Sequence, residues 1–193
     1  MTRPRAAALA ALLITAAGAL YAAVSAVARW EPSLGWLVQA TIHLGELLAV
    51  VALAPAGAGG TSRAARIGLG AAGLGQATLA IAEVVYPHSP AVGDALFGVG
   101  PLLTGIGLIV AGVVVARRWG GPAWQRVAPL VLGIYIFVVM TPVLIGSGGP
   151  PAPAAVWAIA GWDVLWALVA ASALSRLAPA DAGGHRVVAE LGP

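Results

Sequence analysis

The chain has 193 residues, of which 60% are hydrophobic and 9% are charged, with a formal net charge of +3 and no cysteine. A water-soluble domain has about a quarter of its residues charged, so this composition predicts that lipid is the main solvent. The missing cysteines exclude disulfides, thiolate metal sites and thiol catalysis. The length suits one membrane domain without a separate soluble module, and the thinly spread basic residues do not indicate nucleic-acid binding.

Six apolar runs follow one another along the chain, each near the roughly 20 residues that a bilayer-spanning helix requires. Segments rich in arginine, proline and glycine separate them. Transmembrane strands have only about 9–11 residues and alternate in polarity, so the runs predict helices and an all-α bundle. The predicted spans are approximately residues 6–28, 36–54, 67–86, 94–115, 127–146 and 155–175.

The first span also has a rival interpretation, because it begins like a secretory signal peptide. The basic start MTRPR precedes an apolar stretch, and Ala26-Val27-Ala28 fits a small-residue cleavage site. Cleavage would leave five spans. The apolar stretch is longer than the 7–15 residues of a signal peptide, which favours a retained span. At the other end, residues 178–193 predict a disordered cytoplasmic tail.

The arginines predict the orientation of the bundle. If the N-terminus is cytoplasmic, nine arginines fall on the cytoplasmic side and only Arg29 falls outside. An excess of basic residues marks the cytoplasmic loops of membrane proteins, so we expect an N-in, C-in protein of the plasma membrane, with a bacterial inner membrane as the expected setting. Arg117 and Arg118, beside Trp119 and Trp124, predict an interfacial anchor and a candidate site for anionic lipid headgroups.

Small residues predict how the spans pack, because helices in lipid associate through close backbone contact. The fourth span carries two glycine rows with intervals of seven residues, on faces about 200° apart. This pattern predicts a central position for the fourth span and also suits a helix-packing protein partner or a homo-oligomer. Pro101 and Pro142 lie inside the fourth and fifth spans and predict kinks. The rows are Gly98–Gly105–Gly112 and Gly93–Gly100–Gly107.

A few polar side chains interrupt the apolar spans. Gln39, His43 and Glu46 follow one another at spacings of four and three residues and share one helical face. A charged group at mid-bilayer costs at least about 2.5 kcal/mol, so such groups normally face the bundle interior or a wet cavity. We therefore predict an outward-opening polar cavity. Its expected lining is Gln39, His43, Glu46, Gln76 and Asp163, with Glu83, His88 and Asp94 near its mouth.

These residues suit some kinds of chemistry better than others. Ionisable groups at graded depth favour binding of a proton, a cation or a small solute, as in a small transporter, channel or sensor. A carboxylate-bridged metal pair would need repeated Glu-x-x-His motifs, whereas His43 and Glu46 have the reverse order and occur once. Haem ligation by His43 would need a second axial histidine, and His88 and His185 lie outside the spans. We expect neither a metal nor a cofactor.

A second class of function uses the same residues without any ligand. His43, Glu46 and Asp163 can hydrogen-bond to neighbouring helices and hold the bundle together. The protein would then be a non-catalytic structural or accessory membrane subunit. An enzyme is less favoured than either class, because the sequence offers no nucleophile with a placed base; Ser147, in the segment GSGGPP, lacks a histidine partner.

Overall fold

The computed structural model describes residues 2–30 and 32–178. Within these ranges six helical segments are long and apolar enough to span a membrane, which confirms the all-α class and the number of spans. The predicted runs agree with the helices to within a few residues. The predicted tail lies outside the described residues except for Ala178. The elements are α1 (Arg3–Ala28), α2 (Gly35–Leu53), α3 (Arg63–Val85), α4 (Pro90–Arg118), α5 (Ala123–Tyr135), the π-helix η1 (Ile136–Met140), α6 (Thr141–Ser147) and α7 (Pro153–Arg176).

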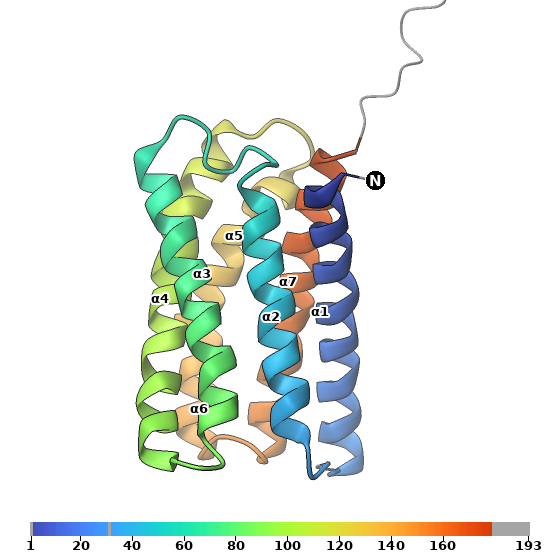
Figure 1. The fold of residues 1–193 in the computed structure, drawn as a ribbon, viewed down its shortest axis with the longest axis vertical. Coiled ribbons are helices and arrows are strands. Elements are labelled where there is room, and N and C mark those ends of the chain that lie inside the picture. Colours follow the sequence, from blue (N-terminus) through green and yellow to red (C-terminus); the bar gives the residue numbers. More distant parts are fainter. Residues whose placement is uncertain (1, 31, 179–193) are drawn as a thin grey trace, which may run out of the picture.

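The helices run up and down an elongated bundle (Figure 1). The N-terminus and the loops after α2 and α4 lie at one end, here called the amino end, and the loops after α1, α3 and α6 lie at the distal end. Neighbouring contacts close the helices into a ring in which α7 returns to α1, and α2 also contacts α7 across it. The outer faces expose apolar side chains such as Leu20, Ile67 and Val138, which suggests a multi-pass membrane protein.

Glycines join α4 closely to both of its neighbours. A Cβ on Gly107 would lie only 2.4 Å from the carbonyl oxygen of Gly68 on α3, and one on Gly112 only 2.6 Å from the backbone nitrogen of Leu130 on α5. The two opposite packing grooves are therefore confirmed. The expected central position is wrong, since α4 contacts α3, α5 and η1 but none of α1, α2 and α7 among the described helices. A helix in a ring packs against one neighbour on each side, so two opposite grooves suit the observed position of α4.

Pro101 and Pro142, two of the three prolines inside the fourth and fifth spans, lie in different surroundings. α4 continues through Pro101 as one helix, whereas the fifth span changes its winding just before Pro142. A proline has no N–H for the carbonyl four residues back, and its ring clashes with that carbonyl. Over Ile136–Met140 the backbone is a π-helix, and the N–H of Thr141 bonds to the carbonyl of Ile136, five residues back. This wider turn makes room for the proline ring.

α1 packs along α2 and α7 through small residues. On α2, Gly45 approaches Ile14 so closely that a Cβ there would lie 2.5 Å from the Ile14 side chain. On α1, a Cβ on Gly18 would lie 3.1 Å from both Ile42 and Oδ2 of Asp163. The first span therefore supplies part of the wall around the buried polar groups.

Candidate functional site

A cavity of about 500 Å³ lies inside the ring toward the distal end. Residues of α2, α3, α4, η1, α6 and α7 line it, together with the loop segment 148–150. The lining combines polar, aromatic and aliphatic side chains and, among the described residues, contains no lysine or arginine. Its polar members are Gln39, His43, Glu83, Asp94 and Asp163, and its aromatic members are Tyr86, Phe97 and Trp162.

Glu46 lies at the centre of the polar cluster and is fully buried. Its Oε2 is 2.6 Å from Nδ1 of His43, one helical turn earlier on α2. Its Oε1 accepts a hydrogen bond from the indole N–H of Trp162 on α7. The side chain of Asp163, also on α7, contacts Glu46 as well. Two carboxyl groups can hydrogen-bond only through a proton on one of them, so the Glu46–Asp163 contact is a place where a proton can be held.

His43 connects this buried centre with the cavity wall. Its Nε2 lies 3.9 Å from Oε1 of Glu83 on α3, while its Nδ1 contacts Glu46. The imidazole thus stands between two carboxyl groups on different helices. A histidine in this position can exchange a proton directly with Glu46, whereas Glu83 lies beyond hydrogen-bond distance and interacts with the ring through its charge. The chain Glu83–His43–Glu46–Asp163 therefore runs from α3 through α2 to α7.

Gln76 and Thr104 form a second polar contact behind the cavity wall. Both are fully buried, and Nε2 of Gln76 lies 3.4 Å from Oγ1 of Thr104 on α4. The Gln76 amide also lies beside the ring of His43. Its Oε1 has no hydrogen-bond partner among the described residues. The pair fits between α3 and α4 because Gly75 allows Thr104 to approach closely.

Some of the residues that the sequence predicted for the cavity line it in the structure, and others do not. Of the expected lining, Gln39, His43 and Asp163 face it. The other two, Glu46 and Gln76, lie behind the wall at 0% exposure. Of the expected mouth residues, Glu83 and Asp94 are part of the lining. His88 is exposed in the turn between α3 and α4 and is not among the lining residues.

Sequence reasoning gave no role in the cavity to three side chains that the structure brings to the site. Phe97 lines the cavity, Trp162 anchors Glu46, and Thr104 pairs with Gln76. The sequence contained a pattern that could have identified Thr104, because this residue lies between Gly100 and Gly107 on the glycine face of α4. Phe97 and Trp162 resemble ordinary apolar positions in the sequence, since only the folded ring shows that they face inward.

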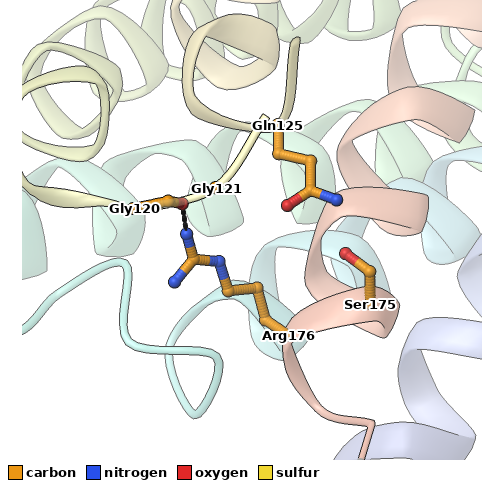
Figure 2. A pocket seen from close by; sticks show the side chains of 5 residues that line it. All are labelled: Gly120, Gly121, Gln125, Ser175 and Arg176. Carbon is orange, nitrogen blue, oxygen red and sulfur yellow. Dashed lines mark hydrogen bonds between the residues drawn. The ribbon is translucent and has the colours of Figure 1, made fainter. Parts of the chain in front are cut away.

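A smaller hollow of about 270 Å³ lies at the amino end, where the loop after α4 meets the end of α7 (Figure 2). The Arg176 guanidinium donates to the carbonyl of Gly120 and stacks 4.5 Å from the ring centre of Trp119. Figure 2 shows this side chain reaching to the loop, so its charge ties the α4–α5 connection to α7. Arg117 and Arg118 are exposed nearby, at the end of α4.

Comparisons with protein-family models, with curated proteins and with solved structures find no match to this chain. The chemistry of the site is therefore the guide to function.

Proposed function

We propose that this is an integral plasma-membrane protein that binds a proton, a cation or a small cationic solute in its distal cavity, as a small transporter, channel or sensor. The observation that carries the proposal is the convergence of Glu83, Asp94, Asp163 and His43 on one cavity, which no lysine or arginine of the described chain lines. Ionisable side chains are costly inside a membrane and commonly mark ion or substrate paths. Four helices contribute these groups, so the arrangement depends on the whole fold.

The charge of the lining favours a positive ligand. Glu83, Asp94 and Asp163 provide carboxyl groups, and His43 is the one lining residue that can carry a positive charge within the described chain. His43 already contacts Glu46 on one side and faces Glu83 on the other. In a site of low dielectric constant, an entering cation interacts with these carboxyl groups far more strongly than it would in water.

The proposed orientation places the cavity mouth outside the cell. The helix ends that carry arginine lie at the amino end of the bundle, whereas Arg29 lies at the distal end. By the positive-inside rule the amino end is cytoplasmic, giving an N-in, C-in protein. Between the cavity and this end, the ring is filled by buried apolar side chains that include Leu53, Leu108 and Leu132. The cavity is thus closed toward the amino end of the bundle, the end that the proposed orientation makes cytoplasmic.

The proposal can be tested by chemical access to single cysteines, since the chain has none of its own. Ile159 lines the cavity, whereas Val164 on the same helix is exposed on the outer face. Intact cells carrying Ile159→Cys or Val164→Cys would be treated with a cationic and an anionic thiosulfonate reagent of similar size. We expect Ile159→Cys to react, faster with the cationic reagent, and Val164→Cys to stay unmodified in the lipid. No reaction at Ile159→Cys would contradict an outward-opening cavity.

A structural or accessory role is the second candidate, and one observation favours it. Glu46 is fully buried, and its contacts to Trp162 and Asp163 join α2 to α7 across the ring. Such bonds stabilise helix association by about 0.6–2 kcal/mol without any ligand. The glycine grooves give this candidate less support, because α3 and α5 already fill most of both rows on α4. A partner helix would find Gly98 open.

Anionic lipid remains a proposed partner at the cytoplasmic interface. Arg117 and Arg118 are exposed in the last turn of α4, and the Arg118 guanidinium lies 3.4 Å from the hydroxyl of Thr61. Exposed basic groups next to a membrane span attract anionic headgroups with about 1 kcal/mol each.

A further inference from the structure

The residues that line the distal cavity indicate which class of cation it binds. This inference rests on the proposed function. The lining carboxyl groups lie at two depths. Glu83 and Asp94 lie within one helical turn or so of the distal ends of α3 and α4, whereas Asp163 follows Pro153, the first residue of α7, by ten residues. At 1.5 Å per residue, Asp163 lies roughly 10 Å deeper than the other two. The cavity thus offers carboxyl groups along its length.

Two of these carboxyl groups have acceptor capacity left. Asp163 is 1% exposed, and its Oδ2 has no hydrogen-bond partner among the described residues. Asp94 makes no hydrogen bond or ion pair within the described part of the chain. A buried acceptor without a donor costs about 1–3 kcal/mol, which concerns Asp163 and not the exposed Asp94. A positively charged ligand in the cavity can pair with the carboxyl group of Asp94, which is exposed and lines the cavity.

Aromatic rings form another part of the wall. Tyr86 and Phe97 pack edge to face with ring centres 5.8 Å apart. The indole of Trp162 is held by its bond to Glu46. Aromatic faces attract cations within about 6 Å of the ring centre, and Met140 adds apolar surface. Carboxyl groups together with aromatic and aliphatic surface suit a charged nitrogen that carries apolar substituents.

An inorganic cation fits this wall less well. A divalent ion needs several ligand atoms converging at about 2.0–2.6 Å, and the described residues contain no group of three or more His, Cys, Asp or Glu placed to hold one. The cavity volume of about 500 Å³ lies within the 300–1,000 Å³ typical of sites for organic ligands. Neither a metal ion nor a proton needs such a space or such aromatic walls.

We propose that the cavity binds an organic ammonium ion, whose nitrogen is attracted by the carboxyl group of Asp94 near the distal end and whose apolar groups contact Tyr86, Phe97 and Trp162. Titration calorimetry of the purified full chain in detergent tests this, with benzyltrimethylammonium and choline as probes. The control is 3,3-dimethylbutan-1-ol, which has the shape of choline with carbon in place of the charged nitrogen. We expect both ammonium ions to bind and the alcohol to bind at least tenfold more weakly.

Variants then locate the site. Asp94→Asn should weaken ammonium binding about tenfold, and Asp94→Glu should retain most of it. Leu144→Trp fills the cavity and should abolish binding, whereas Ile145→Trp, at a neighbouring position that is 78% exposed on the outer face, should bind as the wild type does. Normal binding by both tryptophan variants would place the ligand elsewhere and overturn the proposal.

The calorimetry tests the ammonium inference, and the cysteine test addresses the proposed function. Failure of one can therefore be distinguished from failure of the other. Equal binding of the alcohol and choline would overturn the ammonium inference, as would binding of Mg²⁺ or Zn²⁺ without either ammonium ion. If Ile159→Cys reacts from outside but neither ammonium probe binds, the inference fails and the outward-opening cavity stands. If Ile159→Cys is also unreactive, both fail.

Discussion

The indole N–H of Trp162 donates a hydrogen bond to Oε1 of Glu46, and this contact joins α7 to α2 across the middle of the bundle. Both side chains are buried. The bond fixes the carboxyl group so that its other oxygen meets His43, and it fixes the indole ring where it lines the cavity. A structural contact and the shape of the candidate binding site therefore depend on the same two residues.

Trp162→Phe removes the donor and keeps an aromatic ring in place. We expect the variant to lose about 1–3 kcal/mol of stability, because the Glu46 carboxyl group stays buried with one bond fewer. Thermal unfolding in detergent measures this loss. The matched control is Trp157→Phe on the same helix, whose side chain is 52% exposed and should tolerate the change. Equal unfolding temperatures for the two variants would show that the indole N–H contributes nothing.

Asp163→Asn tests the carboxyl pair. Wild-type Glu46 and Asp163 need a proton between them, whereas an amide at position 163 donates an N–H to Glu46 without one. We expect the variant to unfold at the same temperature as the wild type near pH 5 and at a higher temperature at pH 8, where the shared proton is least available. Residues kept for function often give such gains when neutralised.

The control for this measurement is Asp94→Asn, which neutralises a cavity carboxyl group that does not hydrogen-bond to Glu46. Its unfolding temperature relative to wild type should change little between pH 5 and 8. If Asp163→Asn unfolds at a lower temperature than wild type at every pH, the carboxyl group of Asp163 is a structural contact. That result would favour the accessory-subunit candidate.

Gly107→Ala should separate α3 from α4. The added Cβ would lie 2.4 Å from the carbonyl oxygen of Gly68, so the two backbones would have to move apart. Overpacking of this kind typically costs about 1–3 kcal/mol. Gly98→Ala on the same helix meets no atom within 4 Å and should be neutral or slightly stabilising, since alanine favours helix more than glycine does. Comparing the two unfolding temperatures removes the effect of helix propensity.

Much of the fold was predictable from the sequence because the bilayer restricts what a chain can do. A run of about 20 apolar residues between arginine- and glycine-rich segments has few alternatives to a spanning helix. The two glycine rows on the fourth span also predicted its two packing faces. The sequence did not predict which helices fill those faces. Gly107 meets Gly68 and Gly112 meets Leu130 only because the ring places α3 and α5 there.

For the candidate site, the sequence could predict only which residues share one face of a single helix. The spacing of His43 and Glu46 shows that they can meet, and the structure brings their side chains to 2.6 Å. Their partners come from distant segments, since Trp162 lies 116 residues after Glu46. No local pattern links such positions. The division between lining and buried residues depends likewise on the tertiary ring, which is why the fully buried position of Glu46 behind the wall could not be foreseen.

The proposed orientation predicts opposite labelling at two loops. His88 is exposed in the turn after α3 at the distal end, and Thr61 is exposed in the loop after α2 at the amino end. In intact cells, a membrane-impermeant maleimide should label His88→Cys and leave Thr61→Cys unlabelled. Permeabilised cells should show labelling of both, which controls for thiol exposure. The reverse pattern would place the cavity mouth in the cytoplasm, and the carboxyl groups of the cavity would then meet a ligand from inside the cell.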